Sequence, residues 1–442
     1  MSETPDVGRD GGPSPGTAPG VAEVPSSVAV TRVHHHRRTW KQFVTVMGPG
    51  VVSGAADNDP SGVITYIQVG ATTGFSLLWL MLLSTPMLYY LEEMSTRVGA
   101  VTKRGMSRVL RARYGPAAAA LIVLPLVATN ALTIGADLAG TASGAQLLTG
   151  ISWAWWIVPI TVVIGYTLVF ASYRTLSRFL LILTPLFLLY VITGFIVHPN
   201  WHQVLRATVV PSAQFMPKFF EAALGLLGAT LTPYMFLWQT TETVEARLTV
   251  RELRTENVDV AVGMTYANLV FYFIILVAAA TLYGRGAGIE TVTQAATALA
   301  PLAGSAAAAL FAVGIVVSGF LSVPVMAACS AYALAEMLGW RGGLDRKVGQ
   351  ARGFYVLLTA SLLVGAATPL LRISPVALMF WSQVVNGFLL APLFIVLLMV
   401  ANDPRVVRAH RNGLTANLVG WGTVLLTLGL AVLTVRQLVL GG

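Results

Sequence analysis

The sequence predicts an all-α polytopic membrane protein of about eleven transmembrane helices, and three observations support this fold class. The 442-residue chain is 55% hydrophobic and 11% charged, whereas soluble domains carry about 25% charged residues. Its mean hydropathy is +0.73. Eleven apolar runs are long enough to cross a bilayer, which takes roughly 17–25 residues. The Lys and Arg residues then divide 23 to 5 between the loops on the two sides.

The first part of the chain, residues 1–38, is different in composition from the rest. It is rich in Gly, Pro and Ser and nearly lacks large apolar residues, so we expect a disordered cytoplasmic tail. The tail ends in His34–His36, followed by Arg37 and Arg38. We interpret this run as a basic anchor at the membrane interface, with metal chelation as the alternative.

The predicted membrane domain covers residues 39–441, and its spans follow one another with short loops. The first and sixth spans are long and interrupted. The predicted spans lie at about 42–73, 76–96, 117–148, 153–172, 179–198, 218–245, 258–283, 303–338, 353–371, 375–401 and 415–438.

The distribution of basic residues predicts the topology. Cytoplasmic loops carry an excess of Lys and Arg, so the split of 23 to 5 places the N-terminus in the cytoplasm and the C-terminus outside the cell membrane. The net charge of +9 is thereby explained without a nucleic-acid partner. The single cysteine, Cys329, excludes an intrachain disulfide and is expected to be a buried small side chain. We find no nucleotide-binding motif and no spacing of catalytic residues, so neither ATP-driven transport nor an enzyme is predicted.

The first span contains polar residues that its apolar surroundings do not favour. Asp57, Asn58, Asp59 and Pro60 lie in the middle of the run. A carboxylate at membrane depth costs roughly 2.5–3.5 kcal/mol on insertion scales. Pro60 removes a backbone donor and disfavours helix at the preceding residue. A charge beside a broken helix predicts an ion-binding site of the kind transporters use.

The sixth span mirrors the first. Gly225, Gly228 and Pro233 interrupt its hydrophobic helix. Matching interrupted spans in two five-helix halves indicate an inverted-repeat transporter. The halves would cover about 42–198 and 218–401, with one extra helix at about 415–438. In the alternative interpretation each proline only kinks a packed helix.

Among the acidic residues, we expect only Asp57, Asp59 and Asp137 to lie deep within spans. If the chain unwinds at Pro60, Asp59 and neighbouring carbonyls can converge on one ion. A divalent cation is stabilised by an anionic oxygen together with carbonyl and amide oxygens. The alternative is an aspartate that only accepts a hydrogen bond from a backbone donor at a helix break.

Four motifs carry a resemblance to a known family. Gly48, Pro49 and Gly50 precede Asp59-Pro60 in the first span, and GATLTPYMFLWQ begins at Gly228 in the sixth. Two more are Asp137-Leu138-Ala139 and SQVVNG at 382–387. Across about residues 40–438 the chain resembles the natural resistance-associated macrophage protein (NRAMP) family of divalent metal transporters. The resemblance implies a LeuT-type fold with metal bound between unwound first and sixth helices.

The resemblance also assigns roles to individual residues. It implies that Asp59 is the metal-binding aspartate and that the Ala229 carbonyl contributes to the site, as does that of Ala56 in the inward-open state. The chain departs from the family pattern elsewhere. Gly62 occupies the position of the family's metal-binding Asn, and Thr232 occupies that of its metal-binding Met. In addition, Tyr234 stands for a His and Gly140 for a Glu.

These departures predict a change of metal preference. A thioether favours softer transition metals, and Thr232 offers a hydroxyl instead. Gly62 leaves space for water, and magnesium keeps several waters in its shell. The site therefore resembles that of the NRAMP-related magnesium transporter branch. We expect Mn²⁺ and Mg²⁺ as comparable substrates and Fe²⁺ as a less favoured one.

Proton coupling is expected to be weak or absent, with protons as a candidate second ion. Asp137 remains, but Tyr234 does not take up a proton near neutral pH, because free Tyr titrates near 10. Asp57 could take over the proton-accepting role, or could pair with a donor across the bundle. Asn58, its neighbour in sequence, is a candidate for the same coupling or supporting role. On the tenth span, Gln383 and Asn386 could supply amide oxygens to the ion, or could form an interhelical hydrogen bond.

The predicted function is therefore secondary transport of a divalent metal across the cell membrane by alternating access. The metal is the substrate; no cofactor, no partner other than membrane lipid and no obligate protein partner is expected. The alternative is an ion-coupled symporter of amino acids or organic solutes on the same fold. In that case Asp57 and Asp59 would bind a coupling ion or an amine.

Overall fold

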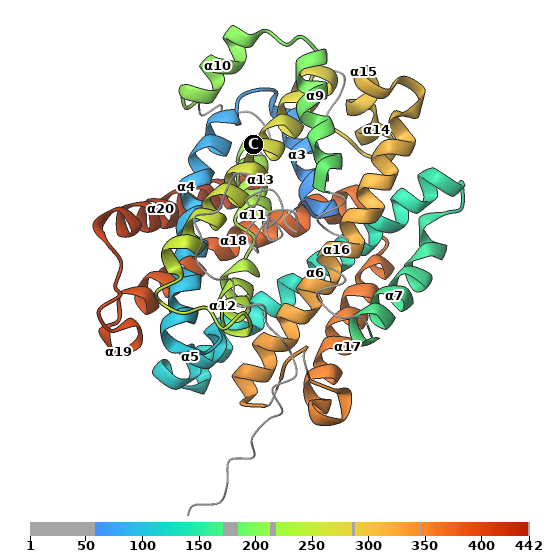
Figure 1. Cartoon of the computed structure of the whole chain (residues 1–442). Coiled ribbons are helices and arrows are strands. Elements are labelled where there is room, and N and C mark those ends of the chain that lie inside the picture. Colours follow the sequence, from blue (N-terminus) through green and yellow to red (C-terminus); the bar gives the residue numbers. More distant parts are fainter. Residues whose placement is uncertain are drawn as a thin grey trace, which may run out of the picture. The chain divides into compact units, whose positions relative to one another are not determined.

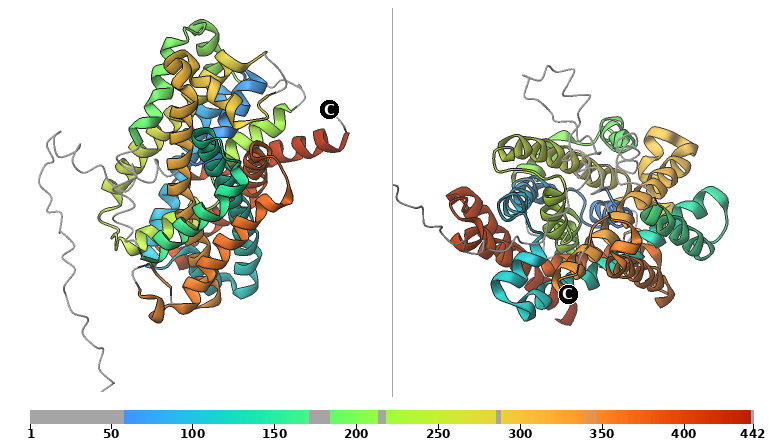
Figure 2. Two further views of the ribbon diagram at one scale, coloured as in Figure 1. Left: turned by 90° about the vertical axis from the view of Figure 1, so that its right-hand side faces the viewer. Right: turned by 60° about the horizontal axis from the view of Figure 1, so that its bottom comes forward.

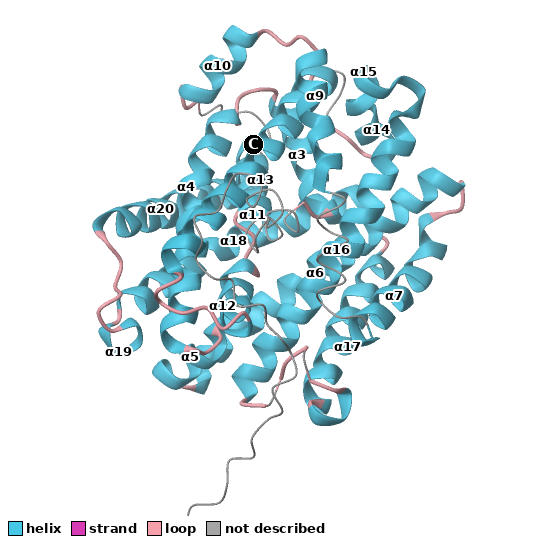
Figure 3. Ribbon diagram, in the orientation of Figure 1, coloured by secondary structure: helices cyan, strands magenta, loops and turns pink. Residues whose placement is uncertain are grey.

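The computed structural model describes residues 58–170, 184–212, 218–284, 288–340, 342–344 and 346–440. Every regular element in these ranges is a helix (Figure 3). The predicted tail with His34–His36, and two predicted site residues, Ala56 and Asp57, lie outside the described residues. The longer helices are α3 (Pro60–Thr73), α4 (Leu78–Thr102), α5 (Met106–Tyr114), α6 (Pro116–Thr149), α7 (Trp153–Phe170), α9 (Leu188–Ile196), α10 (Trp201–Val209), α11 (Phe219–Thr230), α12 (Met235–Glu245), α13 (Leu253–Leu282), α16 (Ala307–Leu338), α17 (Arg352–Ala367), α18 (Pro375–Asn402) and α20 (Leu414–Leu440).

Within the described ranges, seven helical segments are long and apolar enough to cross a membrane, and a shorter apolar helix covers Trp153–Val169. They overlap the predicted third, fourth and sixth to eleventh spans. α4 overlaps the predicted second span but is not among these segments. The total of eleven spans remains a prediction. The seven segments are Pro116–Thr149, Phe219–Glu245, Leu253–Leu282, Val292–Leu338, Arg352–Leu371, Pro375–Asn402 and Leu414–Leu440.

The most extensive helix packing occurs between α6 and α16, α3 and α13, and α11 and α18. In Figure 1 these helices form the middle of the bundle, with α7 and α17 at one edge. Small residues make the close crossings possible. A Cβ on Gly70 of α3 would lie 2.8 Å from the Ala278 Cβ of α13. On α18, a Cβ on Gly387 would lie 2.5 Å from the Leu224 carbonyl oxygen of α11.

The final helix, α20, packs against α18, α11 and α4 (Figures 1 and 2). Its bounds contain the predicted extra helix at about 415–438. A close glycine contact between the two helices supports this packing, because a Cβ on Gly420 would lie 2.7 Å from Leu398 Cδ2 of α18. The extra helix is therefore a packed part of the described bundle.

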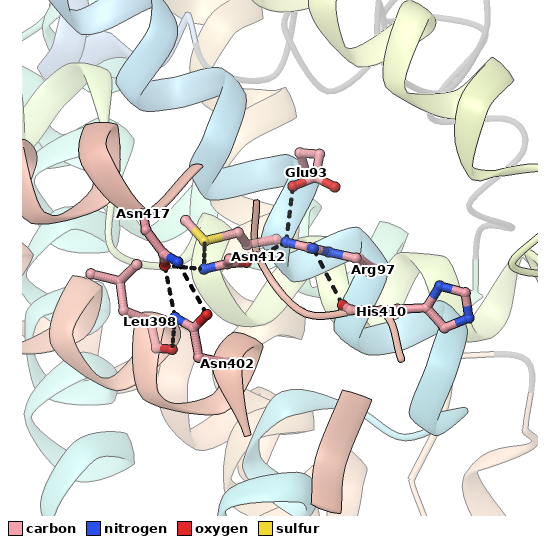
Figure 4. Close-up of polar contacts among 8 residues, drawn as sticks. Glu93, Arg97, Leu398, Asn402, His410, Asn412 and Asn417 are labelled. Atoms are coloured by element: carbon pink, nitrogen blue, oxygen red, sulfur yellow. Dashed lines mark hydrogen bonds and ion pairs between the residues drawn. The ribbon is translucent and has the colours of Figure 1, made fainter. Parts of the chain in front are cut away.

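A buried arginine ties α4 to the connection between α18 and α20 (Figure 4). Arg97 is 8% exposed. It donates to Glu93 one turn earlier at 3.1 Å and to Asn412 Oδ1 at 2.5 Å. Asn412 in turn donates to Asn417 of α20 at 3.0 Å, which also accepts from Asn402 of α18 at 2.8 Å. The terminal nitrogens of buried Arg97 and the amides of half-buried Asn402, Asn412 and Asn417 thus have hydrogen-bond partners, as polar groups removed from water usually do.

The contacts between loops agree with the predicted sidedness of the chain. Lys103, in the loop before α5, donates to the Leu248 carbonyl, and the backbone N–H of Arg108 donates to Glu336 at 3.4 Å. All of these belong to loops or helix ends predicted to be cytoplasmic. At the other end, Ser212 donates to the Ser76 carbonyl at 3.3 Å. The loops thus group as the basic residues predict, while the side on which each group lies remains a prediction.

Candidate cation-binding site

Asp59 is the N-cap of α3, and Pro60 occupies the first helical position. Proline suits that position because its missing N–H would have no helical partner there. The Asp59 carboxylate accepts a hydrogen bond from the Gly62 N–H at 2.6 Å. The residue is 2% exposed. A buried negative charge therefore lies at the positive end of the α3 dipole, which stabilises it.

A second helix end lies nearby, at the C-terminus of α11. This helix ends at Thr230 and α12 begins at Met235, so residues 231–234 are not helical. In a continuous helix the carbonyl of Ala229 would accept from residue 233, but Pro233 has no N–H. The Ala229 carbonyl is therefore left without its helical donor. Pro60 stands in the same relation to Ala56, which lies outside the described residues.

The two half-helices lie side by side. The Tyr66 hydroxyl of α3 is 3.1 Å from the Thr230 hydroxyl of α11. A Cβ on Gly225 would lie 3.6 Å from Thr65 Cγ2. These contacts bring the carbonyl end of α11 to the level of the first turns of α3. A carboxylate opposite a carbonyl-rich helix end is a pair of anionic and dipolar oxygens that suits a cation.

One serine hydroxyl connects Asp59 to the second buried aspartate, Asp137 of α6. The Ser61 Oγ lies 3.0 Å from Asp59 Oδ2 and 2.6 Å from Asp137 Oδ1. The Ser61 N–H and the Ser322 hydroxyl also donate to Asp137, at 3.0 and 2.7 Å. Because a hydroxyl has only one proton, it donates to one carboxylate at a time. Two carboxylates this close repel each other, and a bound cation would relieve that repulsion.

The tenth predicted span contributes two amides. Gln383 Nε2 donates to Asp59 Oδ2 at 3.3 Å and to the Ser61 hydroxyl at 2.8 Å. Asn386 Nδ2 donates to Gln383 Oε1 at 2.9 Å and to Thr133 Oγ1 at 3.2 Å. The interhelical hydrogen bonds that the sequence left as one alternative are thus present. The same arrangement places Gln383 directly against the Asp59 carboxylate.

Two other predicted site residues carry buried oxygens without a hydrogen bond. Thr232 Oγ1 and Asn386 Oδ1 have no hydrogen-bond partner among the described residues. Leaving a buried oxygen unpaired costs about 1–3 kcal/mol, so such atoms usually face water or an ion. Among the described residues no group of three or more His, Cys, Asp or Glu side chains is placed to hold a metal. The candidate oxygen ligands are therefore two carboxylates and several neutral groups. Such a site can bind a cation weakly enough to release it again, as transport requires.

Three further predicted residues, Gly140, Tyr234 and Asn58, pack or hydrogen-bond around the helix ends, and their functional roles remain predictions. Gly140 lies where helices α6, α3 and α18 meet, because a Cβ there would lie 2.8 Å from Pro60 Cβ and 2.6 Å from Met379 Sδ. A larger residue at position 140 would displace Pro60 from its place. Tyr234 is buried and its carbonyl accepts from Cys329 Sγ at 3.5 Å. The carbonyl of buried Asn58 accepts from the Ser318 hydroxyl of α16.

Sequence reasoning missed the serines. Ser318 and Ser322 lie four residues apart on α16 and both reach the site. That spacing in an otherwise apolar helix was an available signal, because it puts both on one face. Glu92 of α4 is also fully buried, at 0% exposed, and α4 continues to Thr102, beyond the predicted span end at about 96. Which acids lie deep in the membrane remains a prediction.

The fold and the site together define a helical membrane protein with the architecture of a secondary transporter. The Natural resistance-associated macrophage protein-like (Nramp) family model matches residues 50–437. The chain belongs to this family.

Known relatives agree with this assignment. The divalent metal cation transporter MntH of Aeromonas hydrophila is 28% identical over 402 residues, covering 88% of this chain and 94% of that protein. A solved structure of a variant of the Eremococcus coleocola manganese transporter has a TM-score of 0.72 at 19% identity, covering 91% of this chain and 88% of that chain. MHP1, a nucleobase-cation-symport-1 family transporter, has a TM-score of 0.56 at 13% identity, covering 88% and 92%. At these identities the two structures support the fold alone.

Proposed function

We propose that this protein is a secondary transporter of divalent metal cations in the cell membrane, with Mn²⁺ and Mg²⁺ as its main substrates and Fe²⁺ as a weaker one. The observation that carries the proposal is the buried Asp59 carboxylate at the N-terminus of α3, a helix that contacts the C-terminal residue of α11 through the Tyr66 and Thr230 hydroxyls. The similarity to a divalent metal cation transporter, MntH, and to a manganese transporter supports the same substrate class.

In the proposed site, Asp59 supplies the charge and Ala229 a carbonyl, with Ala56 as a second carbonyl in the inward-facing state. Thr232 and Asn386 supply neutral oxygens, to the ion directly or through water. Gln383 now directs its Nε2 toward Asp59. Rotation of that amide by half a turn would present its oxygen to the ion, so cation binding is expected to rearrange the Gln383–Asn386 pair.

The proposed preference for Mn²⁺ and Mg²⁺ follows from the oxygen ligands. Hard oxygen ligands suit magnesium and manganese, whereas thioethers select softer metals. Because Gly62 has no side chain, the first turn of α3 leaves room for waters on the ion. Magnesium usually keeps several waters in protein sites.

Transport is proposed to proceed by alternating access with weak or no proton coupling. Asp137 is held by two serine hydroxyls and a backbone N–H. Tyr234 replaces the histidine that the family resemblance implies at this position. The replacement of histidine by Tyr234 removes one group near the ion that would exchange protons at neutral pH.

The test is uptake into proteoliposomes with internal pH recorded. We expect saturable uptake of Mn²⁺ and Mg²⁺, weaker competition by Fe²⁺ and little by Ca²⁺, without matching acidification. Thermal stabilisation of the purified protein by these metals, and not by amino acids, would separate this function from an amino-acid symporter. Stabilisation by amino acids with no metal uptake would overturn the proposal.

Thr232→Met is expected to shift substrate preference toward Mn²⁺ and Fe²⁺ over Mg²⁺ by about tenfold, equivalent to about 1.4 kcal/mol in relative affinity. The physical reason is the added thioether, a softer ligand than the buried hydroxyl it replaces. Thr241→Met is a matched control, because that buried threonine donates within α12 to the Leu237 carbonyl. Unchanged uptake ratios in Thr232→Met would place Thr232 outside the ion's coordination shell.

A further inference from the structure

A cavity of about 490 Å³ lies at the end of the bundle predicted to face outward. Its walls are the last turns of α3, the first turn of α11, residues 289–291 and the first turns of α18. The residues that contribute polar side chains are Gln68, Thr72, Lys218, Glu221, Glu290, Thr291 and Ser374. At about 30 Å³ per water this volume holds on the order of sixteen water molecules. A cation could therefore enter it with its hydration shell intact.

Glu221 is the most informative residue in this cavity. It is 8% exposed and lines the cavity wall. No described residue donates a hydrogen bond to its carboxylate or forms an ion pair with it. Lys218, one turn earlier and also on the wall, acts on it electrostatically. Burying a carboxylate without a partner is costly, so its place at this wall suggests a ligand.

A purely structural role for Glu221, in stabilising the start of α11, does not explain why its side chain lines a cavity. Glu221 is in the first turn of α11, where an acid stabilises the helix dipole. That role is fulfilled by an exposed side chain and requires no cavity. A capping box would use the glutamate to bond the N-cap N–H. The N-cap of α11 is Lys218, whose side chain makes no capping hydrogen bond, so one half of such a box is absent.

The cavity has a defined rim and floor. Gln68 Oε1 accepts from the Ile289 N–H at 2.8 Å, which fixes the segment carrying Glu290 over α3. At the floor, Phe380 and Val384 of α18 pack with Leu224 of α11. Eight residues of α11 separate Glu221 from Ala229, about 12 Å along the helix. The cavity is thus separate from the Asp59 site, with apolar side chains between them.

We propose that this cavity is a second cation site, which recruits hydrated divalent cations from outside. Glu221 is its inner carboxylate, Glu290 lies at its rim, and Lys218 weakens binding by repulsion. The ion passes to Asp59 when the apolar floor opens. This inference rests on the proposed transport function, because only a transporter needs a waiting site outside the central one.

The first experiment measures Mn²⁺ binding to purified Asp59→Asn protein by the loss of the free-ion EPR signal. We expect a weak site that remains in Asp59→Asn and disappears in Asp59→Asn with Glu221→Gln. In proteoliposomes, Glu221→Gln alone is expected to raise the KM for Mn²⁺ roughly tenfold with an unchanged maximal rate. Lys218→Met should lower the KM. Glu256→Gln is the control, because Glu256 occupies the first turn of α13, away from this cavity.

The outcomes distinguish this inference from the function on which it rests. Absence of Mn²⁺ uptake by the wild-type protein would overturn the transport proposal itself. If the wild type transports and Asp59→Asn does not, but Glu221→Gln changes neither KM nor residual binding, only the outer site is wrong. A fall in melting temperature in Glu221→Gln with unchanged KM would assign Glu221 to helix stability and would likewise overturn the site.

Discussion

Asp59→Asn is expected to lower divalent cation uptake by at least about a hundredfold, equivalent to about 2.8 kcal/mol. The substitution removes the negative charge that the proposed site offers to the ion. It also leaves the cation facing the positive end of the α3 dipole. Folding should survive, because Asn is as good an N-cap as Asp and can accept from the Gly62 N–H. Uptake into proteoliposomes, with a melting curve of the purified variant, measures both effects.

Asp403→Asn is the matched control for this substitution. Asp403 is also an N-cap, at the start of the short helix α19 (Pro404–Val407), and its side chain accepts from the Arg405 N–H at 2.8 Å. It lies in the connection between α18 and α20, away from the α3–α11 contact. We expect wild-type uptake from this variant. A folded Asp59→Asn protein that transports as well as Asp403→Asn would contradict the assigned role of Asp59.

Gly228→Ala is expected to reduce the free energy of unfolding by about 3 kcal/mol and to abolish uptake. A Cβ on Gly228 would collide with the Gln383 carbonyl oxygen of α18 and would lie 2.6 Å from the Gly387 N. Both neighbours are backbone atoms, which cannot rotate away as a side chain could. The added methyl would push α11 off α18 beside Ala229 and displace the proposed carbonyl ligand. A melting curve and an uptake assay test the two parts.

Gly314→Ala is expected to raise the free energy of unfolding, in contrast to Gly228→Ala. Gly314 lies within α16, and a Cβ there would meet no atom within 4 Å. Replacing glycine by alanine in a helix without a clash stabilises by about 0.5–1 kcal/mol. The two Gly→Ala variants should therefore shift the melting temperature in opposite directions. Equal shifts would show that the α11–α18 crossing is not tight.

Composition and periodicity were sufficient to predict most of the helices. Long apolar runs leave few alternatives to membrane helices, because lipid forces each backbone group to bond within its own helix. The predicted span at about 375–401 and α18, Pro375–Asn402, nearly coincide. Helix ends were harder to predict. The predicted span at about 76–96 is shorter than α4, which continues to Thr102 and carries buried Arg97, whose guanidinium is bonded to Glu93 and Asn412.

The centre of the candidate site was predictable, and its surroundings were not. Asp59 was identifiable because its charge and Pro60 both conflict with an apolar helix. The link from Asp59 through Ser61 to Asp137 depends on residues 76 positions apart in the chain. No local pattern encodes that distance. Glu221 was overlooked because it lies near a span end, where an acid is ordinary, and only the packing of α3, α11 and α18 reveals its burial.

Anomalous diffraction at the manganese edge, from crystals grown with Mn²⁺, would locate the bound ion. We expect a peak in direct coordination contact with the Asp59 carboxylate and the Ala229 carbonyl, and its loss in Asp59→Asn crystals. A protein that transports Mn²⁺ but shows no peak at Asp59, or keeps the peak in Asp59→Asn, would contradict this expectation.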